Sequence, residues 1–215
     1  MTTTEFDRQL RTYLDTGWPD LSGLSVEDFA AMVEPLRDKA AQIEATVSDE
    51  GSSVGTGPAD PPIPFALVVT SQVVTADRAL PSIHWRTTTG WTEYSADELA
   101  AYAPVDGVEL PHPTAYLVTG VDTGKGTLDV RAKDAVPIIE AQGRSPLTVD
   151  EGVCLLALFP GILKDRNAFF LPGSRDTTKR VAALWVSKGH PRLGWCWEGN
   201  PHTWLGSASC VGRVA

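Results

Sequence analysis

The residue types best suited to chemistry lie near the C-terminus, in residues 194–210. His202 lies there, Glu198 precedes it by four residues, and Asp176 lies upstream of both. Imidazole titrates near neutral pH and can take up or release a proton, and a carboxylate can orient it. His202 is therefore a candidate general acid or base, with Glu198 or Asp176 orienting it. The structural alternative is that the ring bonds a neighbouring carbonyl and holds the turn after Pro201.

Three of the seven tryptophans fall in the same segment. Indole needs a large volume and a partner for its N–H, so this density predicts either a dense core or an aromatic-walled pocket. If the tryptophans line a pocket, we expect it to bind a small molecule or a peptide. The candidate ligand-binding residues are Trp195, Trp197, Asn200, Trp204, Ser207 and Arg175.

The sequence gives weaker support to a metal site, a serine nucleophile or a phosphate-binding loop. Cys196, His202 and Cys210, with Glu198, have no established zinc-ligand spacing, so we predict no metal site and no cofactor. Ser207 lies in G-S-A-S rather than in the G-x-S-x-G motif of serine hydrolases. Residues 121–127, VDTGKGT, lack the phosphate-binding spacing and predict a hairpin turn.

The composition is typical of a globular protein and excludes some partners. The chain has 215 residues and a net charge of −9, so it is a poor partner for nucleic acid. Residues 1–60 hold 12 acidic and 4 basic side chains, which predicts an acidic N-terminal surface. The apolar runs are too short to span a membrane, and the start has no signal-peptide pattern. The three cysteines have no C-x-x-C spacing, so we expect a reduced, cytoplasmic protein.

The first part of the chain predicts helices followed by a linker. One helix follows Thr4 and a second starts at Ser25, whose Ser-x-x-Asp pattern is typical of an N-cap. Pro35 should kink or split that second helix because proline lacks the backbone N–H. Residues 48–62 are rich in Gly, Ser, Pro and Asp, a flexible composition. We therefore expect a helical arm over residues 1–47, a linker over 48–62 and an α+β domain over 63–215.

Two segments of that domain resemble each other. Residues 62–104 and 111–160 share in-register Pro, Ala, Val and Thr positions and predict a strand, a short helix and a capped second helix. In each segment the second helix begins with the pattern Ser/Thr-x-Asp-Glu, whose carboxylates are Asp97-Glu98 and Asp150-Glu151. We interpret these carboxylates as helix caps rather than as a general acid and base.

Residues 166–210 predict an antiparallel β meander. Strands are expected at 167–171, 181–187 and 193–197, with one more at the end of the segment. A five-residue loop over 188–192 would place Trp185 opposite Trp195, on the same sheet face as Trp197.

Several blocks of the chain carry a resemblance to a known group of proteins. They are PFALVVT, AYLVTGVDTG, GRSPLTVDEGV, LPGSRDTTKRVAALWVSKG and GWCWEGNPHTWLGSAS. With them, nearly the whole chain resembles an uncharacterised actinobacterial family of domains of unknown function. The resemblance implies no activity, substrate or partner.

The sequence thus predicts an α+β protein and leaves three functions open. The first is binding of a small molecule or peptide in a Trp-lined pocket near residues 198–204. The second is a small hydrolase, isomerase or cyclase that uses His202 as general acid or base. The third is a structural or interaction protein whose partners dock on the acidic N-terminal helices.

Overall fold

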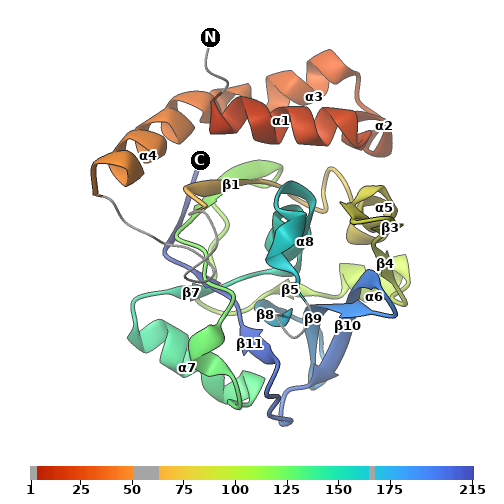
Figure 1. Cartoon of the computed structure of the whole chain (residues 1–215), viewed down its shortest axis with the longest axis vertical. Helices are drawn as coiled ribbons and strands as arrows, with labels where there is room; N and C mark the ends of the chain where they lie inside the picture. The colour runs from red at the N-terminus through yellow and green to blue at the C-terminus, as the bar shows by residue number, and fades with distance from the viewer. Residues whose placement is uncertain (1–3, 51–62, 165–167) are drawn as a thin grey trace.

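The computed structural model describes residues 4–50, 63–164 and 168–215, with the backbone alone for 47–50. The first described part is helical (Figure 1). Its elements are α1 (Glu5–Asp15), α2 (Trp18–Ser22), α3 (Val26–Val33), the 3-10 turn η1 (Glu34–Leu36) and α4 (Arg37–Glu50). The predicted linker begins inside α4, and its remainder, residues 51–62, lies outside the described residues.

Local signals place the ends of these helices where the sequence predicts them. The hydroxyl oxygens of Thr4 and Ser25 accept the N–H groups of Asp7 and Asp28, 3.1 and 3.0 Å away, and so cap α1 and α3. Pro35 splits the second predicted helix, because the 3-10 turn η1 separates α3 from α4. These predictions are confirmed.

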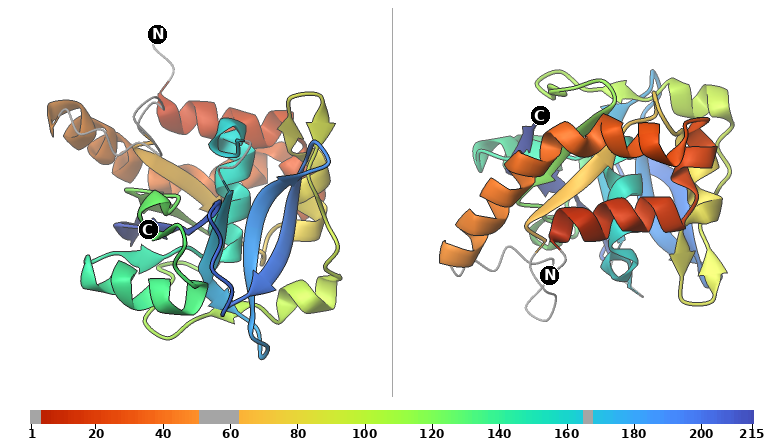
Figure 2. Two further views of the ribbon diagram at one scale, coloured as in Figure 1. Left: turned by 60° about the horizontal axis from the view of Figure 1, so that its bottom comes forward. Right: turned by 90° about the horizontal axis from the view of Figure 1, so that it is seen from above.

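Helix α8 (Val149–Leu158) is the centre of the fold, and most of its side chains are buried. It packs against β1 (Phe65–Val69), β8 (Ala168–Arg175), α1 and α5 (Ala76–Ala79). Seen from above, the N-terminal helices form a layer over β1 and α8 (Figure 2). Buried side chains of α1, α3 and α4 belong to the same hydrophobic core as those of α8 and β1.

Two sheets flank α8. The smaller has the order β1–β6–β13, all antiparallel, with β6 at Ala115–Thr119 and the C-terminal β13 at Gly212–Val214. The larger contains the predicted meander β8–β9–β10, with β9 at Arg180–Ser187 and β10 at His190–Trp197. The α+β class is confirmed. The final strand is not a continuation of the meander, since β11 (Leu205–Ser207) returns to the far edge and pairs parallel with β8.

The two similar segments contain the same order of main elements. One has β1, α5 and α6 (Ala96–Ala100), and the other has β6, α7 (Ala132–Ala141) and α8. Short pieces complete the architecture: η2 (Leu80–Ser82), β2 (His84–Trp85), β3 (Thr88–Thr89), β4 (Trp91–Thr92), β5 (Ala103–Pro104), η3 (Lys125–Thr127), β7 (Ser145–Pro146), η4 (Pro160–Ile162) and β12 (Ser209–Cys210).

The loop after β6 differs from the predicted hairpin turn. Residues 121–127 leave the sheet, and η3 packs against β11. The backbone of Gly124, with a φ of 84°, lies against Ser207, and Asp122 forms an isolated bridge with Ser209. The predicted hairpin does not form, because β6 pairs with β1 and β13, which are distant in the sequence, and not with the segment that follows the loop.

In the described ranges, none of the helices has the length and apolar character needed to cross a membrane.

Candidate functional site

The β9–β10 hairpin carries most of the C-terminal tryptophans, and its register differs from the predicted one. The predicted five-residue loop is a two-residue turn at Lys188 and Gly189, with φ values of 52° and 80°. Positive φ at both positions is typical of a type I′ turn, which matches the twist of the strands. Trp185 therefore lies opposite Arg192, on the other sheet face from Trp195, and the prediction that they share a face is wrong.

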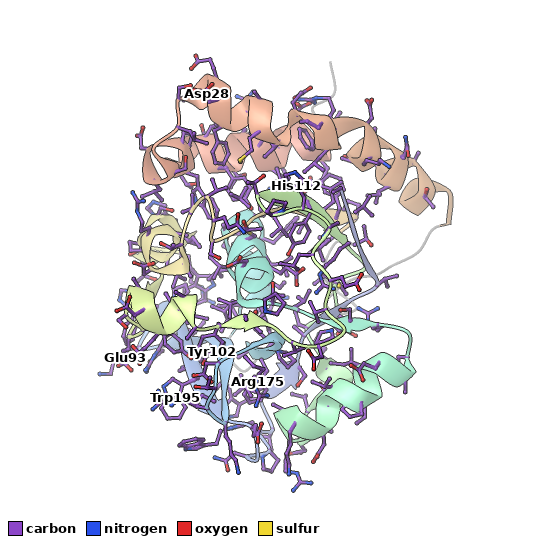
Figure 3. The ribbon with its side chains drawn as sticks, turned by 180° about the vertical axis from the view of Figure 1, so that it is seen from behind. Asp28, Glu93, Tyr102, His112, Arg175 and Trp195 are labelled. Atoms are coloured by element: carbon purple, nitrogen blue, oxygen red, sulfur yellow. The ribbon has the colours of Figure 1, made fainter. Side chains whose placement is uncertain are left out.

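Trp195 and Trp197 do share a face, as the strand alternation predicts. Their rings meet edge to face with centroids 5.3 Å apart, and the guanidinium of Arg180 lies 4.2 Å from the Trp195 centroid. Trp197 is 48% exposed. These side chains form a stack at the surface, at the opposite end of the molecule from the helix that carries Asp28 (Figure 3).

His202 lies among aromatic rings. Its ring centroid is 5.8 Å from that of Phe170 and 5.5 Å from that of Trp204. Its Nε2 is buried and has no hydrogen-bond partner among the residues that the structure describes. Burial lowers the pKa of His202, because the charged imidazolium would lose hydration.

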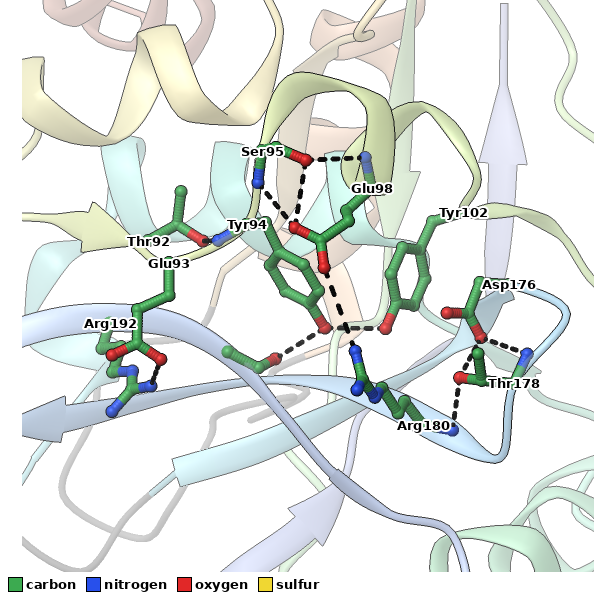
Figure 4. A network of polar contacts seen from close by, with 11 residues as sticks. Thr92, Glu93, Tyr94, Ser95, Glu98, Tyr102, Asp176, Thr178, Arg180 and Arg192 are labelled. Carbon is green, nitrogen blue, oxygen red and sulfur yellow. Dashed lines mark hydrogen bonds and ion pairs between the residues drawn. The ribbon is translucent and has the colours of Figure 1, made fainter.

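Both predicted catalytic carboxylates bond to other groups. Glu198 forms an ion pair with Arg175, and both side chains are about three-quarters buried. Asp176 accepts the N–H of Thr178 at 2.8 Å and its hydroxyl at 2.7 Å, in the loop between β8 and β9 (Figure 4). Within the described residues, neither carboxylate hydrogen-bonds to His202, so the geometry lacks an oriented general base.

The remaining predicted binding residues are dispersed. Asn200 is exposed in the turn, where its N–H donates to the carbonyl of Trp197 at 3.1 Å. Trp204 packs on the second, smaller hydrophobic cluster, which contains Phe170. Ser207 is 1% exposed, and its N–H donates to the Thr127 hydroxyl at 2.8 Å. Of the predicted set, the structure brings three pairs into contact: Arg175 with Glu198, Trp195 with Trp197, and His202 with Trp204.

The environment of His202 makes a testable prediction about pH. Because its pKa is lowered in the folded state, the unfolded state binds more protons between the folded pKa and the ordinary value. Stability should therefore fall as the pH drops through that window, and His202→Gln should remove this part of the pH dependence. Following the ring protons of His202 by NMR gives its pKa directly. A pKa above the ordinary histidine value would instead reveal a carboxylate partner and favour catalysis.

A cavity of about 340 Å³ lies elsewhere, between the end of β1, helix α6 and the first turn of α8. Its volume is within the usual range for small-molecule sites. We call it the Asp150 cavity. It is lined by Thr70, Ser71, Gln72, Thr75, Ala76, Ala96, Leu99, Ala100, Tyr102, Pro104, Leu110, Pro113, Thr148, Val149, Asp150 and Ser174. None of the nine site residues predicted from the sequence lines it.

Asp150 is the one carboxylate that lines this cavity. Its Oδ2 accepts both the N–H and the hydroxyl of Ser71, at 2.9 and 3.0 Å. Burial raises the pKa of Asp150, although the bonds from Ser71 act in the opposite direction. Asp150 lies in the first turn of α8, as the sequence predicts, but its hydrogen-bond partner is Ser71, at the end of β1, and not an N–H group of its own helix.

The neighbouring carboxylates confirm the cap prediction. Glu98 and Glu151 each complete a capping box, with Ser95 and Thr148 respectively. A capping box uses one carboxylate, at the third position of the helix, which leaves Asp150 free for another contact. That surplus carboxylate is the signal in the sequence that points to the cavity.

The outer wall of the cavity is built by residues 95–104. Helix α6 has no buried residue, and β5 after it pairs with Ser174 and Arg175 of β8. The hydroxyls of Tyr94 and Tyr102 lie 2.7 Å apart and join this wall to the sheet (Figure 4). Burial raises the pKa of both phenols, so they are neutral near pH 7.

The described lining of the cavity carries several groups that can bind a ligand. Ser71 hydrogen-bonds to a carboxylate, and the described lining residues include no imidazole or amine, the bases that most often take the proton of a serine nucleophile. Elsewhere in the described part of the chain, no three His, Cys, Asp or Glu side chains gather in a way that suits a metal ion. Half of the lining residues are apolar and half carry a hydroxyl, amide or carboxylate group, so the cavity offers a ligand both apolar surface and hydrogen-bonding groups.

Comparison with known proteins gives a family without an assigned activity. The Family of unknown function (DUF5701) matches residues 12–215, and the chain belongs to it. No curated protein and no solved structure matches the chain.

Proposed function

We propose that this member of the DUF5701 family binds a small molecule in the Asp150 cavity. The observation that carries the proposal is a carboxylate fixed by Ser71 inside a cavity of about 340 Å³. Small-molecule binding agrees with the first hypothesis from the sequence, but the site lies at the first turn of α8 instead of beside the C-terminal tryptophans. The apolar half of the lining suits a compact ligand with an apolar body, and the polar half suits a ligand that also carries a polar group.

Filling the cavity tests this proposal. Ala100 lines the cavity and Ala101 does not, although both are exposed at the end of α6. Ala100→Trp should therefore block the site, and Ala101→Trp is the matched control. Wild-type protein and both variants are screened by saturation-transfer NMR against cationic, neutral and anionic molecules of about ten non-hydrogen atoms, a size that suits such a pocket.

We expect members of the panel to bind wild type and Ala101→Trp equally. Ala100→Trp should weaken their binding by about tenfold or more, which corresponds to about 1.4 kcal/mol. Equal binding to all three proteins would place the site outside the cavity. A panel without any binder would also contradict the proposal.

The other expectations from the sequence stay predictions. They are a peptide ligand or acid–base catalysis at residues 198–204, docking of partners on the N-terminal helices, a cytoplasmic location and a bacterial source. In the described structure, Glu198 and Asp176 bond to Arg175 and Thr178 and not to His202. Acid–base catalysis by His202 therefore has less support than ligand binding.

A further inference from the structure

The lining of the Asp150 cavity has a marked charge asymmetry. Among the described residues, the lining contains Asp150 but no Lys, Arg or His, and its other polar groups are hydroxyls, an amide and backbone atoms. An anionic ligand would meet a carboxylate and no cation. A divalent metal prefers six or more oxygen ligands with several carboxylates or waters among them, and one carboxylate is a poor start for such a site.

Asp150 is held in one orientation with one oxygen left over. Both bonds from Ser71 go to Oδ2. Oδ1 accepts no hydrogen bond from any residue in the described ranges, and it is not one of the sealed buried atoms that lack a partner. The cavity therefore presents a fixed acceptor with an open lone pair.

Two other shielded carboxylates of the described chain are neutralised by arginine. Glu151 pairs with Arg213, and Glu198 pairs with Arg175. In the part of the chain that the structure describes, no basic side chain forms such a pair with Asp150, and the carboxyl that acts on it is Glu151, which raises its pKa. Asp150 is partly buried and has no cationic partner among the described residues, so a cationic ligand would stabilise its carboxylate more than a neutral one.

We propose, on the basis of the proposed function, that the ligand is a small primary or secondary amine whose ammonium group donates to Oδ1 of Asp150. Its apolar part lies against Leu99, Leu110 and Val149, which line the same cavity. The ammonium takes the part that arginine has beside Glu151 and Glu198. Thr75 and Tyr102 also line the cavity, and a hydroxyl oxygen can accept a further N–H group.

Three probes of similar shape test the class of ligand: benzylamine, benzyl alcohol and benzoate. Their dissociation constants are measured by NMR titration for wild type, Asp150→Asn and Ala100→Trp. Wild type should bind benzylamine about tenfold or more tightly than benzyl alcohol, as a charge-assisted bond requires, and should bind benzoate weakest. Asp150→Asn should remove the preference for the amine and leave the affinity for benzyl alcohol within about twofold.

A thermal melt in the absence of probe shows that Asp150→Asn is folded. We expect it to be at least as stable as wild type at neutral pH, because asparagine can still accept from Ser71 and does not place a charge in the cavity.

The outcomes separate the two proposals. If benzylamine and benzyl alcohol bind equally to wild type and to Asp150→Asn, and Ala100→Trp blocks both, the amine class is wrong and the small-molecule site remains. Failure of wild type to bind benzylamine also overturns the amine class. If Ala100→Trp binds benzylamine as wild type does, the cavity is not the site and both proposals fall.

Discussion

Arg213→Met is expected to lower the free energy of unfolding by roughly 3–5 kcal/mol, because it leaves a buried carboxylate without its cation. Glu151 is 0% exposed, and its two oxygens accept from Arg213 at 2.5 and 2.9 Å. The hydroxyl of Tyr116 and the N–H of Thr148 donate to the same carboxylate, at 2.9 and 2.7 Å. Arg213 thus ties the C-terminal strand β13 to the central helix α8.

Urea denaturation of wild type and variant measures this effect. The matched control is Arg131→Met, since Arg131 pairs with Asp134 and both side chains are more than 40% exposed. An exposed pair of this kind contributes about 0–1 kcal/mol. Equal losses of stability for the two variants would contradict the role assigned to Arg213.

Gly206→Ala is expected to cost about 3 kcal/mol, because the added methyl group would meet backbone atoms that have no room to move. Its Cβ would lie 2.5 Å from the carbonyl carbon of Gly124 and 2.8 Å from the carbonyl oxygen of Thr123. The close approach of β11 to the 121–127 loop thus depends on glycine at this position. This agrees with the small residues that the sequence places in G-S-A-S.

Gly126→Ala is the control for this prediction. Gly126 lies in the same loop, and an added Cβ would meet nothing within 4 Å. Its φ is not in the positive range, so we expect its melting temperature to stay within a few degrees of wild type, as for most surface changes. If Gly206→Ala melts at the wild-type temperature, the packing of β11 against the loop is looser than described.

Local rules explain the parts of the fold that the sequence predicts well. The caps at Thr4, Ser25, Ser95 and Thr148 depend on atoms three residues apart, so their pattern is visible in the chain itself. The meander strands are predicted for the same reason, since alternation along a strand is a local property.

Strand pairing explains why the predicted length of the β9–β10 turn and the predicted face of Trp185 are wrong. Pro191 predicts a loop of five residues, but the structure has a turn of two. Antiparallel alternation places Pro191 at a position that needs no N–H for the ladder with β9. A shift of register by an odd number of residues moves Trp185 to the other face.

The sequence does not predict the cavity, because the residues that line it are also far apart along the chain. Its lining comes from the end of β1, from α6, from the segment before β6 and from α8, and no local motif joins them. The contact between Ser71 and Asp150 spans 79 positions, so a cap motif alone could not predict it.

The most direct test is to map benzylamine binding onto the backbone amides by NMR. We predict that the largest shift changes fall at Ser71, Ala100 and Asp150, and that Ala100→Trp abolishes them. Shift changes centred on residues 198–204 instead would contradict the account and return the site to the C-terminal tryptophans.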